Sequence, residues 1–244
     1  MSHEKFNFVL TESQMVTPRV LQMSFRRADG QPFTYVPGQF ITLHLPFENM
    51  ELRRSYSVAT IPGSSGEVEI AVTQVEGGRA TGLLFGMKPG ELVSATGPFG
   101  RFVLREDPPS RYMLIATGTG VSPYRAMLPQ LKGLLAAKSH SAVVMLGVRG
   151  PDECLFGGDF LGFAKENPGF EFVASYSRRV SEPAQAHERK GYVQEHLMEL
   201  KPDPKRDIVY LCGNPDMIDT AVERLKAIGF DNTNLRREKY VSSN

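Results

Sequence analysis

Residues 112–123 read YMLIATGTGVSP, a short apolar run followed by a turn that contains two glycines. The apolar part, Tyr112 to Ala116, has the length and composition of a buried strand. Ser122 can cap a following helix, and Pro123 suits the first turn of that helix. A glycine-rich turn between a strand and a helix exposes backbone amides and a helix N-terminus, which together bind a phosphate. The stretch therefore predicts a strand, a phosphate-binding turn and a helix.

Other features of this stretch leave a second interpretation open. A tight turn that uses glycine only for its backbone freedom would give the same spacing, which differs from the Gly-x-Gly-x-x-Gly of Rossmann dehydrogenases. Pro129 falls seven residues beyond Ser122. It removes a backbone hydrogen bond there, so we expect the helix to bend or to be short.

The alternation of apolar strands with helix-length segments continues to the end of the chain. Such a pattern predicts a parallel sheet with right-handed crossovers, whose ligands bind at the carboxyl ends of the strands. The expected strands are residues 112–116, 142–147, 170–175 and 208–211.

The first half of the chain has a different pattern, in which short strands are separated by turns such as Asp29-Gly30 and Pro89-Gly90. Residues 67–73, EVEIAVT, alternate with the period of two that is typical of a half-buried antiparallel strand. The pattern predicts an all-β barrel. The expected strands are residues 19–25, 39–45, 55–59, 67–75 and 92–96.

A polar, proline-rich run, REDPPS at residues 105–110, separates the two halves and suits a linker. The predicted fold class is therefore mixed all-β plus α/β. An antiparallel β-barrel domain, residues 1–106, precedes a parallel α/β nucleotide-binding domain, residues 107–244.

Composition excludes several classes of function. The 28 basic and 27 acidic residues give a net charge of +1, which provides no broad attraction to nucleic acid or to a membrane. The chain shows no apolar run of membrane-spanning length and no signal peptide, so a cytoplasmic protein is expected. Cys154 and Cys212 are the two cysteines, too few for an iron–sulfur cluster or a four-cysteine zinc site, and the five histidines are scattered. We expect no metal and no disulfide.

Basic and hydroxyl residues follow the strand at residues 170–175. Arg178 can pair with a 2′-phosphate in bidentate fashion, Ser177 and Lys190 can donate to it, and Tyr192 can stack on adenine. An NAD site would place an acidic residue at this strand end, so the pattern favours NADPH over NADH. The alternative is an ordinary solvated basic loop.

A second glycine ends the strand at residues 208–211, where the sequence continues Cys212-Gly213-Asn214. This places Cys212 at the same edge of the sheet as Thr117. The alternative is that Cys212 is a small buried hydrophobic residue.

In the barrel, Arg54 and Tyr56 lie two residues apart, so both side chains leave the same face of an extended strand. A cation and an aromatic ring that project together fit a flavin, with Arg54 on the pyrophosphate, Tyr56 on the isoalloxazine and Ser57 near the reactive N5. The alternative is a strand with a surface arginine. Residues 78–81, GRAT, begin a short helix that is expected to end near Met87, and the helix amides could hold the same pyrophosphate.

Together these segments resemble the ferredoxin–NADP reductase family, in order along nearly the whole chain. Residues 54–57, RSYS, resemble the family's Arg-x-Tyr-Ser flavin motif, and residues 78–81 resemble its Gly-x-x-Ser turn with threonine in place of serine. Residues 97–100, 117–123 and 212–217 resemble the end of the family's barrel, its pyridine-nucleotide turn and its Cys-Gly-x-x-x-Met segment.

The resemblance implies FAD and NADP(H) as cofactors, with hydride transfer between NADPH and flavin N5 in a pocket shaped by Ser57, Cys212 and Glu238. The implied FAD contacts are Arg54, Ser55, Tyr56, Ser57, Gly78, Ala80, Thr81 and Tyr240. The implied NADP contacts are Thr117, Gly118, Thr119, Gly120, Arg149, Ser177, Arg178, Lys190, Tyr192, Gly213, Asn214 and Met217. Tyr240 resembles the family's terminal tyrosine, which covers the flavin, but four residues follow it here.

The resemblance also implies a monomeric ferredoxin/flavodoxin–NADP reductase whose partner is ferredoxin or flavodoxin. These carriers are acidic, and a basic rim of Arg53, Arg236, Arg237 and Lys239 could steer them. Two other functions fit the same architecture: a stand-alone reductase component of an oxygenase, or a free-flavin reductase. A non-enzymatic alternative is a regulatory module that keeps the fold without flavin.

Overall fold

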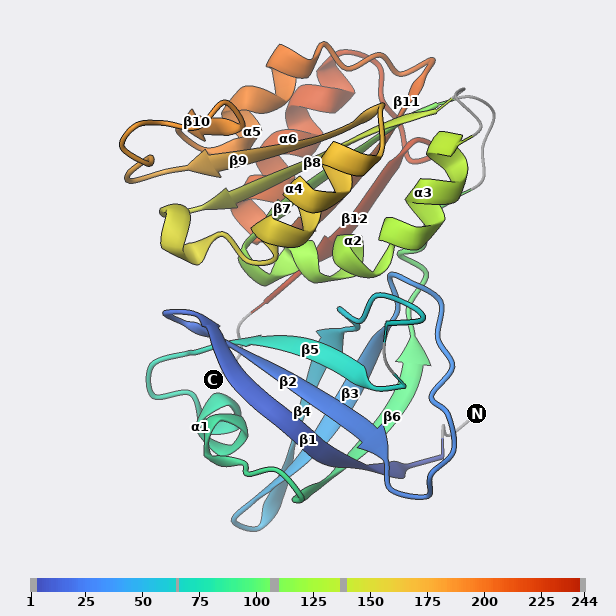
Figure 1. The fold of residues 1–244 in the computed structure, drawn as a ribbon, viewed down its shortest axis with the longest axis vertical. Helices are drawn as coiled ribbons and strands as arrows, with labels where there is room; N and C mark the ends of the chain where they lie inside the picture. Colours follow the sequence, from blue (N-terminus) through green and yellow to red (C-terminus); the bar gives the residue numbers. More distant parts are fainter. Residues whose placement is uncertain (1–3, 65, 106–109, 137–139, 242–244) are drawn as a thin grey trace. The chain divides into compact units, whose positions relative to one another are not determined.

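The computed structural model describes residues 4–64, 66–105, 110–136 and 140–241, and the chain divides into two compact units between Val103 and Leu104 (Figure 1). The boundary expected between residues 106 and 107 lies outside the described residues. The first unit contains an antiparallel sheet and the second a parallel sheet with helices, which confirms the predicted fold class.

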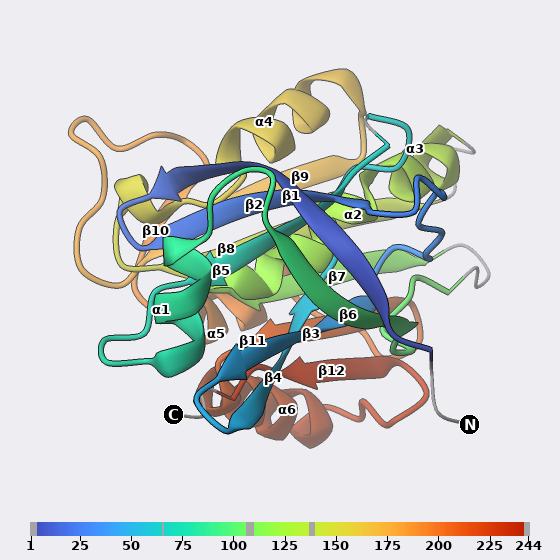
Figure 2. The same ribbon diagram turned by 90° about the horizontal axis from the view of Figure 1, so that it is seen from below.

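The sheet of the first unit has the strand order β4-β3-β6-β1-β2-β5, and all of its pairs are antiparallel. Its two edge strands, β4 and β5, contact each other, so the sheet curls into a barrel whose strands β1 and β6 are strongly twisted (Figure 2). The elements are β1 (Phe6–Thr17), β2 (Val20–Arg27), β3 (Phe40–Phe47), β4 (Met50–Ser57), β5 (Val68–Thr73), α1 (Arg79–Gly86) and β6 (Leu92–Phe99).

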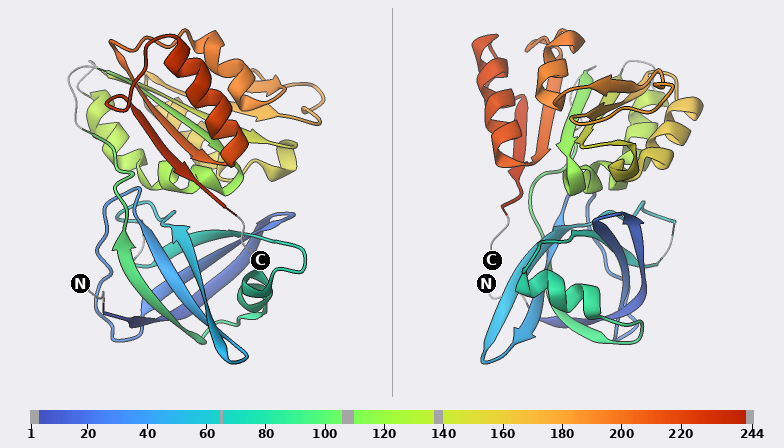
Figure 3. Two further views of the ribbon diagram at one scale, coloured as in Figure 1. Left: turned by 180° about the vertical axis from the view of Figure 1, so that it is seen from behind. Right: turned by 90° about the vertical axis from the view of Figure 1, so that its left-hand side faces the viewer.

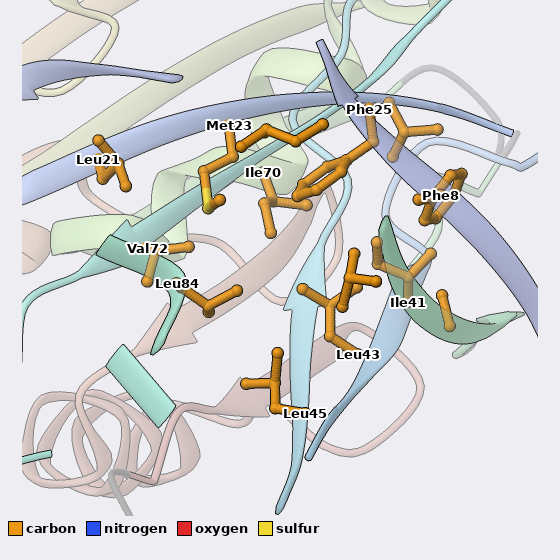
Figure 4. Packing of buried hydrophobic residues seen from close by; sticks show 14 of the residues in the cluster. Phe8, Leu21, Met23, Phe25, Ile41, Leu43, Leu45, Ile70, Val72 and Leu84 are labelled. Carbon is orange, nitrogen blue, oxygen red and sulfur yellow. The ribbon is translucent and has the colours of Figure 1, made fainter. Parts of the chain in front are cut away.

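Apolar side chains from several strands fill the barrel. Phe8, Met23, Ile41 and Ile70 are fully buried there, and Leu84 of α1 joins them (Figure 4). Burying a side chain of this size stabilises a fold by about 1.5–3 kcal/mol before the entropy cost. The core therefore fixes the inner face of β3, which supports the neighbouring strand β4.

The second unit has the strand order β10-β9-β8-β7-β11-β12, and every pair is parallel. Helices α5 and α6 cover one face of the sheet, and α2, α3 and α4 cover the other (Figure 3). The strands are β7 (Arg111–Thr117), β8 (Ser141–Val148), β9 (Phe170–Tyr176), β10 (Glu188–Lys190), β11 (Asp207–Gly213) and β12 (Leu235–Lys239). The α-helices are α2 (Ser122–Ala126), α3 (Leu128–Ala136), α4 (Gly157–Glu166), α5 (Val193–His196) and α6 (Pro215–Ala227), and the 3-10 turns are η1 (Gly118–Val121), η2 (Pro151–Glu153) and η3 (Leu197–Leu200).

The helix after β7 is interrupted as the proline predicted. It ends at Ala126 and resumes at Leu128, so Pro129 occupies the first turn of α3, where its missing amide costs little. The expected cap at Ser122 is wrong, because the 3-10 turn η1 leads directly into the helix, so that α2 already begins at Ser122 and Val121 is the capping position. Within the described residues, the Ser122 hydroxyl is buried without a hydrogen-bond partner.

Three strands of the structure were not predicted: β1, β10 and β12. The strand predicted at residues 55–59 is β4, which begins earlier, at Met50, and ends at Ser57. Both cysteines are free thiols. Over the part of the chain that the structure describes, none of the helices combines the length and the apolar character needed to span a membrane, and no group of three or more potential metal ligands occurs.

Candidate active site

The carboxyl ends of β7 and β11 lie side by side at the point where the strand order of the parallel sheet reverses. Strands β8, β9 and β10 extend from β7 in one direction, and β11 and β12 extend in the other. Ligands of open α/β sheets bind at such a switch point. The two glycine turns that were predicted separately, η1 after β7 and Gly213 after β11, therefore meet there.

The two turns approach each other so closely that glycine is required. A Cβ atom on Gly120 would lie 2.4 Å from the carbonyl oxygen of Cys212 and 2.9 Å from Gly213 Cα. Gly213 has a φ of +121°, and a Cβ there would lie 2.5 Å from Thr117 Oγ1. The two turns thus pack backbone against backbone, and this glycine cradle lies beside the start of α6, where a helix N-terminus fits the pyrophosphate of a dinucleotide.

Hydrogen bonds tie the second turn to the first. The Asn214 amide donates to Thr117 Oγ1 at 2.8 Å. Asn214 Oδ1 then accepts from the amides of Asp216, at 2.8 Å, and Met217, at 3.2 Å, and so caps α6. The Thr117 hydroxyl thus fixes the N-terminus of a 13-residue helix beside the glycine turn.

Cys212, Glu238 and Tyr240 form a second group at the same edge. Cys212 is fully buried and pairs in register with Glu238 of β12. Burial and the nearby Glu238 charge raise the pKa of the Cys212 thiol well above its usual range, against the effect of a hydrogen bond with Tyr240. The thiol therefore keeps its proton at neutral pH. In the same group, the Tyr240 amide donates to the Gly213 carbonyl at 2.8 Å.

Tyr124 is a buried residue of this edge that was not identified from the sequence. Its hydroxyl lies 3.1 Å from the carbonyl oxygen of Ile115 and 2.9 Å from that of Tyr210, so it bridges β7 and β11. Burial raises the pKa of Tyr124 well above its usual range. Its bridging position arises from two strands distant in sequence, so no local pattern indicates it.

The cations expected to select the nucleotide lie at the carboxyl ends of β8, β9 and β10. The amide of Arg178 donates to the carbonyl of Arg149 at 3.0 Å, and that of Ser177 donates to Val148 at 2.9 Å. Lys190 pairs in register with Tyr176 on β9. Over the described ranges, the Arg149, Arg178 and Lys190 head groups have no hydrogen-bond or ion-pair partner.

Tyr192, expected to stack on adenine, follows β10 and is 59% exposed. Its amide donates to Glu195 Oε2 at 3.1 Å, which fixes the start of α5. An exposed ring on a fixed backbone is free to receive a planar base.

In the first unit, β4 carries the residues expected to hold flavin. Arg54 and Tyr56 pair in register with Leu43 and Ile41 of β3 and share one face of the sheet, whereas Ser55 lies on the other face. Tyr56 packs against the barrel core, and burial raises its pKa to about 12 despite the opposing Arg54 charge. Arg54 Nη1 donates to the Arg53 carbonyl at 2.8 Å.

The turn before α1 has a second cradle. Gly78 is the N-cap of α1, and a Cβ there would lie 2.7 Å from Thr81 Oγ1 and 2.9 Å from Val75 Cβ. Thr81 Oγ1 lies 3.1 Å from the Gly78 carbonyl and 3.2 Å from the Val75 carbonyl, so the threonine keeps its hydroxyl at the turn. Ala80, the second residue of α1, is buried. The α1 amides remain available to an anion.

The proposed catalytic residues come from both units. Ser57 is buried at the end of β4, whereas Cys212 and Glu238 are in the second unit. A contact of Ser57 or of flavin with Cys212, Glu238 or Tyr240 stays a prediction.

Comparisons with known proteins identify the chain. Residues 7–104 match the model of the oxidoreductase FAD-binding domain, and residues 114–223 match that of the oxidoreductase NAD-binding domain. Ferredoxin–NADP reductase B of Sorangium cellulosum is 31% identical to the chain over 97% of the chain and 98% of that protein. The chain belongs to the ferredoxin–NADP reductase family. As a member of the family, it is a flavin-dependent NAD(P)H oxidoreductase with FAD-binding and NAD(P)-binding domains.

Other relatives in the family have different roles. The reductase component of propane 2-monooxygenase from Rhodococcus jostii is 29% identical over 96% of the chain, and the chain spans 63% of that protein's length. The crystal structure of a cytochrome P450 reductase from Amycolatopsis superposes with a TM-score of 0.86 at 27% identity, over 100% of the chain and 72% of that structure. Members of this family thus include both ferredoxin–NADP reductases and oxygenase reductase components.

Proposed function

We propose that this protein exchanges electrons between NADP(H) and ferredoxin or flavodoxin. FAD would be held by the residues of β4 and the α1 turn, and NADP(H) by the switch-point turns and the basic strand ends. FAD, when bound, would supply the chemistry that links hydride transfer from the nicotinamide to electron transfer to the carrier.

The observation that carries the choice of NADP(H) is the group of cations at the ends of β8, β9 and β10. Arg149, Arg178 and Lys190 present charges without partners among the described residues, and a 2′-phosphate supplies the complementary anion. The name of the Sorangium relative, a ferredoxin–NADP reductase, supports the same choice.

The chain's own residues would align the nicotinamide and exclude water from it. The Gly118–Gly120 turn would hold the pyrophosphate, and Thr117 and Asn214 would fix the helix terminus beside it. Cys212 Sγ would keep its proton, because its burial disfavours the thiolate, and would form an uncharged wall of the pocket. The Ser57 hydroxyl and the Glu238 carboxylate would be the polar groups of the same pocket.

A second candidate function follows from the other relatives. The similarity to oxygenase reductase components supports a role as a stand-alone reductase that delivers electrons to an oxygenase. A free-flavin reductase would use the same two cofactor sites. A purified protein without flavin absorbance would instead favour a regulatory module.

Stopped-flow reduction of the purified, flavin-containing protein by NADPH and by NADH tests the proposal. We expect NADPH to reduce the flavin faster at equal concentration. Arg178→Ala should lower kcat/KM for NADPH by about tenfold to a hundredfold, the value of one charge-assisted contact to phosphate, and should leave NADH almost unchanged.

Lys205→Ala is the matched control, because it removes an exposed cation at the opposite edge of the same sheet. It should not change the ratio of the two nucleotides. Equal rates with NADPH and NADH in the unmodified protein would contradict the NADP(H) assignment.

A further inference from the structure

We infer that Arg179 and Asp152 form a specificity-determining pair, in which Arg179 neutralises a carboxylate that would otherwise disfavour the 2′-phosphate of the nucleotide. The inference rests on the proposed nucleotide site for the identity of its ligand. It assigns to two adjacent arginines, Arg178 and Arg179, two different tasks.

The pair is defined by a direct contact. Arg179 Nη2 lies 2.5 Å from Asp152 Oδ1. Asp152 belongs to η2, which follows β8 after Arg149 and Gly150. A Cβ on Gly150 would lie 3.1 Å from Asp152 Oδ1 and 3.2 Å from Arg179 Nε, so the ion pair packs directly on a bare stretch of backbone.

The pair joins the turn after β8, which carries Arg149, to the turn after β9, which carries Arg178. The amides of Arg178 and Arg179 both donate to the carbonyl of Arg149, at 3.0 and 3.3 Å. The Arg179 guanidinium binds Asp152, whereas the Arg178 guanidinium has no hydrogen-bond or ion-pair partner within the ranges that the structure describes. The Asp152 carboxylate is therefore bound to the residue that directly follows Arg178 in the chain, and both of these arginines are tied by their amides to Arg149.

An unpaired carboxylate at this position would act against NADP(H). It would repel a phosphate that carries nearly two negative charges, and it could accept hydrogen bonds from the ribose hydroxyls of NAD(H), as acidic residues do in NAD sites. Arg179 cancels the charge and occupies Oδ1. The side chains are 65% and 49% exposed, so solvent and salt weaken the effect to a few-fold change.

The experiment compares the flavin-containing protein with Arg179→Ala, Asp152→Asn and the double variant. The measured quantity is the ratio of kcat/KM for NADPH to that for NADH at low ionic strength. We expect Arg179→Ala to lower the ratio by about threefold, as an unscreened carboxylate near the phosphate would. The double variant should regain the original ratio, because it removes the carboxylate as well, and Asp152→Asn alone should not lower it.

A second measurement uses 2′-AMP and 5′-AMP as competitive inhibitors, which differ only in the position of the phosphate. Arg179→Ala should weaken inhibition by 2′-AMP more than inhibition by 5′-AMP, and the double variant should restore it. Lys205→Ala, which removes a distant positive charge, controls for the change in net charge.

Two outcomes would overturn the inference. A double variant whose ratio stays as low as that of Arg179→Ala would mean that Arg179 contacts the nucleotide itself. An unchanged ratio in Arg179→Ala would mean that the pair has no part in selection. The test reads the change between variants, so it remains decisive even if the unmodified protein prefers NADH, a result that would refute the proposed NADP(H) function instead.

Discussion

Glu51 in β4 shows how a single carboxylate joins three segments of the barrel. It accepts from Lys5 Nζ at 2.7 Å, from Arg53 Nε at 2.9 Å and from the nearly buried His44 at Nδ1, at 2.8 Å. These three hydrogen bonds, that of His44 first, lower the pKa of Glu51 to about 2. His44 Nε2 continues the network to Thr96 Oγ1 at 3.0 Å, so the network links β4, β3 and β6.

We expect Glu51→Gln to lower the Tm at neutral pH and to have less effect in acid. The folded pKa, about 2, lies below the ordinary value of 4.5, so the stabilisation by the carboxylate is fully present above about pH 4.5 and is lost as the pH falls toward 2. Thermal unfolding at about pH 7, 4.5 and 3 checks this. Glu48→Gln, a change at an exposed turn of the same hairpin, is the control, and a Tm difference that stays constant with pH would contradict the expectation.

At the scale of elements, the strands that the sequence did not reveal share a physical reason. β1 is 12 residues long, but its pairing with β2 shifts register near Leu10 and again near Met15, and such bulges break a period-two pattern. β12, LRREK, and β10, ERK, are edge strands of the parallel sheet. Charged residues are common on edge strands, which are kept in the sheet by backbone hydrogen bonds more than by apolar burial. Such strands therefore lack the apolar pattern from which a strand is predicted. Strands with clear alternation or continuous burial, such as β5 and β7, were predicted.

The site residues that could be predicted are likewise those with a local sequence pattern, whereas contacts between distant residues could not be predicted. The turns at Gly78, Gly120 and Gly213 were predicted because glycine between a strand and a helix is a local pattern. Asn214 followed by proline carries an N-cap signal as well. The pairing of Arg179 with Asp152 joins residues 27 positions apart, so only the folded chain shows it.

The close approach of two turns gives a prediction at this scale. Gly120→Ala would place a Cβ 2.4 Å from a backbone oxygen of the β11 turn, and the backbone of one turn must move. A displacement of about 1 Å at a positioning element costs on the order of a hundredfold in rate, so we expect kcat/KM for flavin reduction to fall by that order. Gly133→Ala makes the same chemical change in open space on α3 and should stabilise the protein by about 0.5–1 kcal/mol without loss of rate. Similar rates for both variants would show that the cradle is not needed.

For the molecule as a whole, charge bears on the choice of electron carrier. The net charge is +1, so attraction of an acidic carrier must come from local cations. Of the four cations expected to form a basic rim, Arg53 is paired with Glu51, and Lys239 lies 2.6 Å from Asp219. Arg236 donates to the Asn232 carbonyl at 3.4 Å. Among the described residues, the Arg237 side chain has no partner and is exposed, so it is the rim cation best able to attract a carrier.

We therefore expect ferredoxin and flavodoxin to be reduced with a higher kcat/KM than free flavin, but with a modest dependence on salt. Electrostatic steering by strongly charged surfaces raises association rates by about 10- to 1000-fold. Because acidic residues neutralise part of this rim, we expect steering to raise the association rate of a carrier by about tenfold or less. Steady-state turnover of the three acceptors at several ionic strengths measures it, with a neutral quinone as the acceptor that should not respond to salt. Arg237→Gln should remove most of the salt dependence for the carriers. Free flavin as the best acceptor, or two carriers that are not reduced at all, would reject the proposed partners and direct attention to an oxygenase component.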